Sequence, residues 1–234
     1  MVKTLVITGA SRGIGFSTAE HFLEQGWRVI NLSRQTCSLE AVKNFSVDFS
    51  QENWQEQIRE DLLQEFSQAQ QISVIHCSSA YGSGGLESVQ DQTLRQDFEV
   101  NLIAPILLNQ ILLDKMSPGS SILYLGSTLS EKAVKGVISY VISKHGVVGL
   151  MRSTCQDLAG TGIHTACVCP GFTDTEMLRQ HLQGNTAMLE SVKARVGENR
   201  LIQPKEIAQT LFFCSQNPVI NGSVIHANLG QIEN

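Results

Sequence analysis

The sequence lacks several features that would each mark a class of protein. No run of lysine and arginine interrupts its 234 residues, whose formal net charge is −5, so neither a nucleic-acid-binding surface nor a basic membrane-surface helix is expected. No apolar stretch approaches the roughly 18 residues that a membrane-spanning helix needs. The chain enters an apolar run directly after Lys3, without the pattern of a signal peptide, which favours a cytoplasmic protein.

Recognisable metal-binding patterns are also missing. The six cysteines form no Cys-x-x-Cys pair and no zinc-like spacing, which favours a reducing environment without a metal site. Cys167 and Cys169 share one face of an expected strand. A reactive or metal-binding pair is one interpretation of them, but burial as small hydrophobic side chains is favoured. His76, at the end of an apolar run, is likewise interpreted as a packed core residue.

Short apolar runs alternate with segments of helical spacing along the chain. Strands are expected at residues 4–8, 27–32, 72–77, 121–125, 163–169 and 224–227, and helices at 16–25, 52–68, 91–113, 139–159 and 204–215. Pro105 must kink or interrupt the third of these helices. This alternation predicts an α/β fold, in which a single doubly wound parallel sheet of Rossmann type carries helices on both faces.

No linker, repeat or low-complexity tract divides the chain, so one domain is expected over residues 1–234. Residues 173–200 are the least regular and directly follow an expected strand. Because ligands of doubly wound sheets bind beyond the carboxyl ends of the strands, this segment is a candidate mobile lid over the site. Only 13 residues separate Arg34 from Asp48, and residues 38–44 leave room for about two helical turns.

A glycine-rich segment joins the first expected strand to the first expected helix, with the spacing Gly-x-x-x-Gly-x-Gly. Glycines let the backbone approach a pyrophosphate closely, and a helix N-terminus offers free N–H groups to its oxygens. The strand, turn and helix context therefore predicts dinucleotide binding, with a tight turn that binds nothing as the alternative. The residues expected to hold the cofactor here are Gly9, Ser11, Arg12, Gly13, Ile14 and Gly15.

The end of the second expected strand lacks the acidic residue that NAD sites usually carry about 20 residues beyond the glycines. Ser33 and Arg34 stand there instead, and Arg12 lies inside the glycine turn. A carboxylate would repel a 2′-phosphate, whereas guanidinium groups bind its oxygens. The pattern therefore favours NADP(H), unless Arg34 is simply a solvated loop residue.

Tyr140 and Lys144 lie four residues apart and so share one face of an expected helix. A nearby ammonium favours the phenolate and lowers the pKa of tyrosine, which would let the pair exchange a proton near neutral pH. Ser127 directly follows an expected strand, and its hydroxyl can donate to a carbonyl oxygen on which hydride transfer builds negative charge. Together these residues indicate hydride transfer to or from a carbonyl carbon.

In order and rough spacing, several motifs resemble the short-chain dehydrogenase/reductase family over essentially the full chain: the glycine turn, Asn101, Ser127, Tyr140, Lys144, Pro170-Gly171 and Thr175. The resemblance implies that Tyr140 is the general acid in reduction and the base in oxidation. It implies that Lys144 lowers the pKa of Tyr140 and hydrogen-bonds the nicotinamide ribose. Ser127 would position the carbonyl, and Asn101 would hold a water in the proton relay.

The resemblance also implies cofactor contacts beyond the glycine turn. Thr175 would touch the nicotinamide amide and the phosphates, and Asp48 would meet the adenine ring. Other interpretations remain: Asp48 as a helix N-cap, Asn101 as a residue that caps or kinks a helix, and Ser127 as a loop hydroxyl. The further residues assigned to cofactor binding are Ser78, Pro170, Gly171 and Thr173.

One stretch departs from the family pattern: His76-Cys77-Ser78-Ser79 stands where the family usually has Asn-Asn-Ala-Gly. Ser79 in place of glycine adds a side chain near the expected cofactor. This departure favours the alternative of an NADP(H)-binding regulatory or redox-sensing protein without turnover, and a Rossmann domain without any ligand is a third interpretation. The retained Ser127, Tyr140 and Lys144 favour an enzyme instead.

The substrate expected from the resemblance is a ketone or a 3-oxoacyl thioester, which would be reduced to an alcohol. This expectation rests on residues 170–177, which resemble the corresponding stretch of 3-oxoacyl carrier-protein reductases. The resemblance also implies a homodimer or homotetramer, because family members commonly pair through the helices expected at 91–113 and 139–159. The second of these is apolar on more than one side, as a helix covered twice would be.

Overall fold

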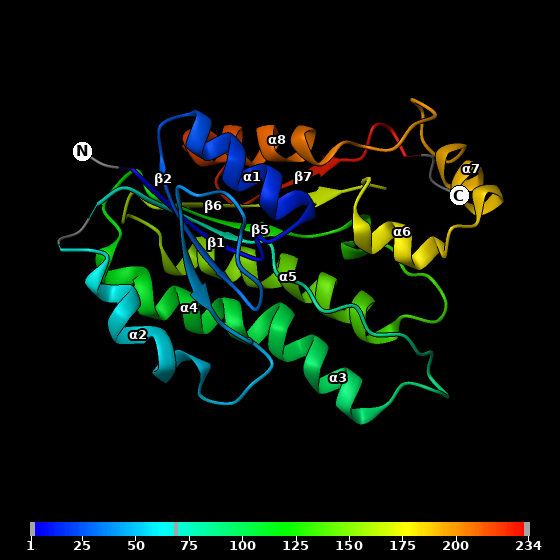
Figure 1. Ribbon diagram of the computed structural model, residues 1–234, viewed down its shortest axis with the longest axis horizontal. Coiled ribbons are helices and arrows are strands. Elements are labelled where there is room, and N and C mark those ends of the chain that lie inside the picture. Colours follow the sequence, from blue (N-terminus) through cyan, green and yellow to red (C-terminus); the bar gives the residue numbers. More distant parts are fainter. Residues whose placement is uncertain (1–2, 68–69, 232–234) are drawn as a thin grey trace.

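A computed structural model describes residues 3–67 and 70–231 (Figure 1). Seven strands form one parallel sheet in the order β3-β2-β1-β4-β5-β6-β7. Their bounds are β1 (Thr4–Thr8), β2 (Arg28–Ser33), β3 (Val42–Ser46), β4 (Ile72–His76), β5 (Ser121–Leu125), β6 (His164–Pro170) and β7 (Ser223–Ala227). The predicted α/β fold with a doubly wound sheet is confirmed. β1 and β4 are buried along their whole length, as central parallel strands are when helices cover both faces.

Helices cover both faces of this sheet (Figure 1). On one face lie α1 (Gly13–Glu24) and α8 (Pro204–Gln216), which pack against each other through the rings of Phe22 and Phe212, 5.0 Å apart. On the other face lie α2 (Trp54–Gln64), α3 (Asp91–Phe98), α4 (Ala104–Leu112) and α5 (Ile138–Asp157). α2 is shorter than the helix predicted at residues 52–68. The last residue of that prediction, Gln68, lies outside the described residues.

The predicted interruption at Pro105 takes the form of a π-helical segment. Between α3 and α4, residues Glu99–Ile103 (η1) form wider i→i+5 turns, in which the amide of Ala104 bonds the carbonyl of Glu99. Pro105 lies in the first turn of α4. Because proline has no N–H, it cannot donate to the carbonyl of Asn101, four residues earlier. The sequence therefore breaks the helical hydrogen-bond ladder at a candidate site residue.

The expectation of about two helical turns at residues 38–44 is wrong. Residues 34–41 form an irregular connection, and β3 follows and pairs with β2. The cause is the amide of Asn44, whose Oδ1 accepts hydrogen bonds at 2.8 Å from the backbone of Cys37 and from Asn31. These bonds fold the connection tightly onto the sheet, where the side chains of Cys37 and Val42 are buried.

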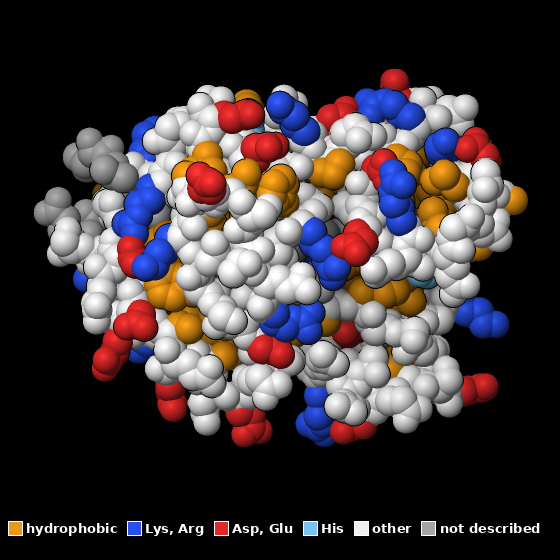
Figure 2. Space-filling model, in the orientation of Figure 1, with side chains coloured by type: hydrophobic (Ala, Val, Ile, Leu, Met, Phe, Trp, Pro, Cys, Tyr) orange, Lys and Arg blue, Asp and Glu red, His pale blue; other side chains and the backbone are white. Residues whose placement is uncertain are grey.

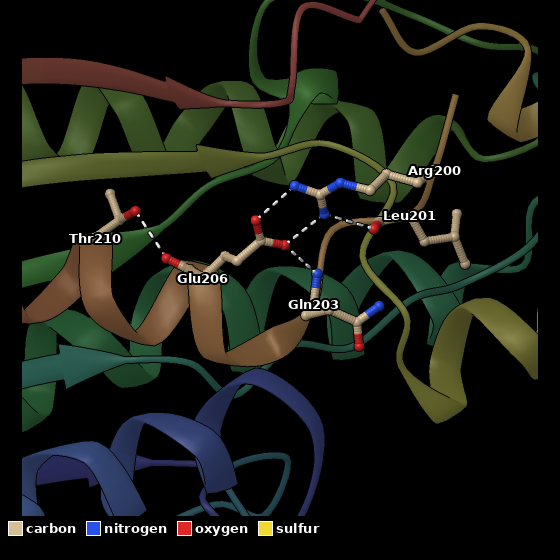
Figure 3. A network of polar contacts seen from close by, with 5 residues as sticks. All are labelled: Arg200, Leu201, Gln203, Glu206 and Thr210. Atoms are coloured by element: carbon tan, nitrogen blue, oxygen red, sulfur yellow. Dashed lines mark hydrogen bonds and ion pairs between the residues drawn. The ribbon is translucent and has the colours of Figure 1, made fainter. Parts of the chain in front are cut away.

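The segment predicted as a lid contains two short helices, α6 (Glu176–Leu182) and α7 (Thr186–Lys193), beyond the carboxyl ends of the strands (Figure 1). Its far end is fixed by a bidentate ion pair, with both nitrogen–oxygen distances between Arg200 and Glu206 equal to 2.7 Å (Figure 3). Hydrogen bonds from Arg200 and from the amide of Gln203 hold the pKa of Glu206 at about 2. The start of α8 is thus a fixed anchor, and mobility of the segment before it stays a prediction, as does the single domain.

Acidic and basic side chains are interspersed over the face of the molecule shown in Figure 2. Within residues 3–67 and 70–231, no helix combines the length and the hydropathy needed to cross a bilayer.

Candidate functional site

The glycine turn between β1 and α1 closes in a way that only glycine allows. Gly9 and Gly13 have φ angles of 77° and 58°, in the region that side chains disfavour. A Cβ on Gly15 would stand 2.2 Å from the carbonyl oxygen of Gly9. No side chain caps the start of α1, so its first N–H groups are suited to an anion. Ser11 and Ile14 are partly exposed in the same turn.

Two other segments meet this turn, as the prediction of one cofactor site requires. The backbone amide of Ser78, after β4, lies 3.0 Å from the position of a Cβ on Gly9, and the methyl of Thr175 lies 3.4 Å from that of a Cβ on Gly13. Thr8 holds the first contact in place, because its hydroxyl accepts hydrogen bonds at 3.0 Å from the amides of Cys77 and Ser78.

The residues after β6 are arranged by their own backbone. Pro170 ends the strand, and a Cβ on Gly171 would lie 3.0 Å from Asn228, so the chain passes closely there. Thr173 is buried, and its hydroxyl donates to the carbonyl of Gly171 at 3.1 Å. Thr175 caps α6 by accepting from the amide of Leu178 at 3.3 Å. Of these residues, Thr175 is the one whose side chain contacts the glycine turn.

The residues expected to bind a 2′-phosphate are less well placed to do so. Ser33 is buried, and its hydroxyl donates to the carbonyl of Gln35 at 2.5 Å. Arg12 forms an ion pair with Glu176 of α6, with a nitrogen–oxygen distance of 2.7 Å and both side chains 55% exposed. Arg34 is exposed at the end of β2. The structure thus brings the two arginines to the surface but gives one of them a carboxylate partner.

Asp48 lies near Arg34 and makes a local turn. Its Oδ1 accepts from the amide and the hydroxyl of Ser50 at 3.0 and 2.7 Å. Burial by itself would raise the pKa of Asp48, but the hydrogen bonds from Ser50 and the charge of Arg34 hold it below the ordinary value. The alternative interpretation as the N-cap of α2 is not met, because Asn53 occupies that position.

Tyr140 and Lys144 lie on α5 as predicted, with the ammonium 5.5 Å from the centre of the tyrosine ring. Lys144 is 3% exposed, and its Nζ donates to the carbonyl of Leu125 at 2.9 Å. That bond joins α5 to the end of β5, directly before Gly126 and Ser127. The lysine is therefore fixed between the catalytic candidates on the two elements.

The expected lowering of the tyrosine pKa by lysine is not seen in this arrangement. Burial raises the pKa of Tyr140 to about 12, while hydrogen bonds with Ser127 and with Ser79 act in the opposite direction. The physical reason is that protein atoms surround the phenol of the half-buried Tyr140, while the ammonium of Lys144 is directed at the carbonyl of Leu125. The phenol is consequently protonated at neutral pH, which is the form that a general acid requires.

Ser127 begins a single 3-10 turn, η3 (Thr128–Ser130), directly after β5. Its Oγ accepts from the amide of Leu129 at 3.1 Å, which leaves the hydroxyl hydrogen for another acceptor. Gly126 before it must be glycine, because a Cβ there would stand 2.6 and 2.8 Å from the sulfurs of Cys169 and Cys167. These thiols are buried and 3.8 Å apart. Among the described residues, no group of three or more His, Cys, Asp or Glu side chains is placed to hold a metal ion.

Asn101 is buried in the π-helical segment, and both the oxygen and the nitrogen of its side-chain amide form hydrogen bonds. Its Oδ1 accepts from the amide of Ala80 at 2.8 Å, and its Nδ2 donates to the carbonyl of Ala80 and to the hydroxyl of Ser143. A water held by this residue would therefore bind the main-chain carbonyl, to which Pro105, four residues later, has no N–H to donate.

Sequence reasoning missed Asp97, which lies four residues before Asn101 and is 2% exposed. Its Oδ2 accepts from the amide of Gly82 at 3.0 Å and from the hydroxyl of Ser139 at 2.6 Å. The spacing of four along a predicted helix was a signal that both polar side chains would lie on one face.

His76 is the packed core residue that was predicted. It stacks on Tyr124 with ring centres 5.1 Å apart, and its Nε2 lies 2.9 Å from Oδ1 of Asn109. Burial lowers the pKa of His76 to about 4, so the ring is neutral at pH 7. It takes no part in the candidate site.

The sequence as a whole matches known families. The family described as enoyl-(acyl carrier protein) reductase matches residues 9–231. Protein FixR of Bradyrhizobium diazoefficiens is 28% identical over 247 residues, which cover 98% of this chain and 86% of that protein. The 3-oxoacyl-(acyl-carrier-protein) reductase FabG of Escherichia coli is 25% identical over 240 residues, which cover 97% of this chain and 96% of that protein.

Solved structures share the fold. A blue fluorescent protein from a metagenomic library, in complex with NADPH, superposes with a TM-score of 0.86 at 21% identity and covers 97% of each chain. A 4-hydroxyisoleucine dehydrogenase complexed with NADH superposes with a TM-score of 0.87 at 22% identity, over 97% of this chain and 98% of that one.

Proposed function

Because the chain belongs to the short-chain dehydrogenase/reductase family, we propose that it uses NADP(H) to reduce a ketone or 3-oxoacyl-type carbonyl to an alcohol. The observation that carries the proposal is the position of Tyr140, whose phenol has the Ser127 side chain near it and whose ring centre lies 5.5 Å from the Lys144 ammonium. An acid, a hydroxyl donor and a cation then surround the place where a carbonyl oxygen would gain negative charge.

The glycine turn fits the cofactor. Its backbone packs so closely that a Cβ on Gly15 would collide with Gly9, and the uncapped start of α1 faces the place where a pyrophosphate would lie. Thr175 and Ser78 border the same turn. When bound there, NADPH would supply a hydride to the carbonyl carbon of the substrate.

The residues of the chain would then handle the proton and the charge. Tyr140, protonated at neutral pH, would donate its proton to the carbonyl oxygen as the hydride arrives. Ser127 would donate the hydrogen that its bond from Leu129 leaves unused. Lys144, whose pKa burial lowers, would stabilise the phenolate that Tyr140 becomes, and the carbonyl of Asn101 would hold a water of the proton relay.

The choice of NADP(H) over NAD(H) rests on Arg34 and Arg12, which flank the end of β2 and the glycine turn. Relatives in fold include one complexed with NADPH and one with NADH, so the fold accommodates either cofactor. We infer the preference from the exposed guanidinium of Arg34 and from the absence of a carboxylate at the end of β2.

We also propose that the protein is a homodimer or homotetramer in the cytoplasm. Apolar side chains are 40 to 47% exposed on the helices expected to pair, namely Ile103, Ile106, Leu113 and Ile142. All six cysteines are free thiols, which supports a reducing compartment. Light scattering of the purified protein tests the assembly, and a single monomeric species would contradict it.

The function is tested by titrating the protein with NADPH and with NADH while nicotinamide fluorescence is followed. Absorbance at the reduced nicotinamide band is then followed with a panel of ketones that includes a 3-oxoacyl thioester. Preferential NADPH binding with turnover of any ketone is the expected result. Binding without turnover across the panel would favour a redox-sensing protein, and failure to bind either nucleotide would overturn the proposal.

A further inference from the structure

An aromatic side chain that the mechanism does not use lies next to the ring of the candidate general acid. Tyr81, in the connection after β4, has its ring 4.6 Å from the ring of Tyr140 at an angle of 57°. On its other side, the ring of His181 from α6 lies 5.6 Å away at 76°. Tyr81 is 36% exposed. It therefore presents a ring surface to solvent between the catalytic tyrosine and the lid segment.

The position of Tyr81 is fixed by hydrogen bonds on both sides of it. Asn101 holds its predecessor Ala80 through two bonds, and Asp97 holds its successor Gly82 through one. Gly82 allows this approach because a Cβ there would stand 2.2 Å from the methyl of Thr93. The connection is therefore bound closely to the buried face of α3 and η1.

The same two side chains also hold the segment that carries Tyr140. Asp97 accepts from Ser139, directly before Tyr140, and Asn101 donates to Ser143, three residues after it. Two buried polar groups thus set the distance between the tyrosines from both ends. Such double anchoring is what a substrate-contacting ring needs in order to keep a defined position relative to the reacting group.

Resting on the proposed reduction of a carbonyl, we propose that Tyr81 and His181 form an aromatic subsite for a planar, ring-bearing or conjugated substituent on the carbonyl carbon. A carbonyl oxygen that reaches the Tyr140 hydroxyl places its substituents against the neighbouring ring of Tyr81. Because the rings of Tyr81 and His181 are nearly perpendicular, a third ring could pack against the face of one and the edge of the other. Met177 lies four residues before His181 on α6, a spacing that places both on one face of the helix. Because Met177 is 45% exposed, its polarisable thioether would extend this surface.

The test compares an aryl methyl ketone with an aliphatic methyl ketone of equal carbon number. Wild type is expected to show a higher kcat/KM for the aryl ketone, and Tyr81→Leu is expected to lower that value by about fivefold to tenfold while changing the aliphatic value by less than about twofold. Tyr81→Phe should retain the preference, because it keeps the ring. Leu86→Ala, at an 86% exposed position of the same connection, is the matched control and should leave both values unchanged.

Binding is measured separately, so that the subsite and the reaction can fail independently. The dissociation constants of both ketones are measured by ligand-observed NMR on Tyr140→Phe saturated with NADP+, with and without Tyr81→Leu. Tighter binding of the aryl ketone that Tyr81→Leu removes supports the subsite, even if wild type reduces no ketone and the proposed reaction falls. Equal binding of both ketones, binding of neither, or an equal loss for both on Tyr81→Leu would overturn it.

Discussion

The residues proposed to perform the chemistry and those proposed to select the cofactor are held in opposite ways. Lys144 and Asn101 are buried, and their polar groups bond residues of other segments. Arg12 and Arg34 are exposed, and the one ion pair that Arg12 makes, with Glu176, lies in solvent. Exposed charges interact weakly through water and salt, whereas buried polar groups must be satisfied. The proposed catalytic residues are therefore held by many contacts, and the residues proposed to select the cofactor by few.

The largest effect should come from the proposed catalytic residues. Tyr140→Phe removes the only proton that the proposed mechanism gives to the carbonyl oxygen, so kcat should fall by about 10²- to 10⁴-fold. NADPH affinity should stay within about twofold, because the glycine turn is untouched. Stopped-flow absorbance and fluorescence titration measure the two quantities. Tyr124→Phe, which removes a buried hydroxyl bonded to Asn109 and Thr154, is the control, and equal losses in both variants would refute the assignment.

The burial of His76, outside the candidate site, makes a prediction about stability. The pKa of His76 is about 4 in the folded protein, against an ordinary value of 6.5, so the unfolded chain binds more protons between these values. The contribution to the free energy of unfolding is present above pH 6.5 and is lost as the pH falls towards 4, by about 3 kcal/mol in all. His76→Asn should lack this loss relative to wild type in urea unfolding at pH 7 and pH 4.5. Parallel behaviour of the two proteins would show that His76 is not buried as a neutral ring.

The role of the exposed arginines in cofactor selection is tested at Arg34. If its guanidinium binds a 2′-phosphate, Arg34→Ala should weaken NADPH binding by about 10- to 100-fold, the range of a charge-assisted hydrogen bond. NADH binding should change by less than about twofold, since NADH lacks that phosphate. Fluorescence titrations give both constants. A common loss for the two nucleotides would assign Arg34 to the pyrophosphate or to folding instead.

The smallest effect is expected at Glu176, which shares Arg12 with any bound phosphate. Because exposed ion pairs contribute about 0 to 1 kcal/mol, Glu176→Gln should tighten NADPH binding by up to about fivefold at low salt, and less at high salt. Glu190→Gln, which breaks a similar exposed pair with Lys193 on α7, is the control. An equal change for NADH would mean that the pair acts on the lid segment rather than on the 2′-phosphate.

Periodicity and turn residues predicted every described strand except β3, the long helices and the order of the candidate site residues. They did so because each signal is local: Pro105 breaks the helix it lies in, and Gly15 allows the turn it closes. Contacts between distant segments had no such signal. The pair Arg12–Glu176 joins residues from opposite parts of the chain, and the tilted ring contact between Tyr81 and Tyr140 depends on how closely Gly82 approaches Asp97.

The failed prediction at residues 38–44 has the same origin. A length that suits two helical turns was filled by an irregular connection because the side chain of Asn44 bonds the backbone of Cys37. The pKa of Tyr140 was predicted with the wrong sign because spacing places a lysine near a tyrosine but does not reveal burial. In both cases, the outcome depends on how side chains from different segments pack together, which the local sequence does not show.

The packing of α1 against α8 also has a consequence for biosynthesis. The apolar face of α1 is covered by Phe212, which leaves the ribosome about 190 residues after Phe22. At translation rates of about 5 to 20 residues per second, that face stays uncovered for roughly 10 to 40 seconds. During this interval the nascent chain exposes Phe22 and Trp27, which makes it a substrate for chaperones and a target for aggregation until its C-terminal part emerges.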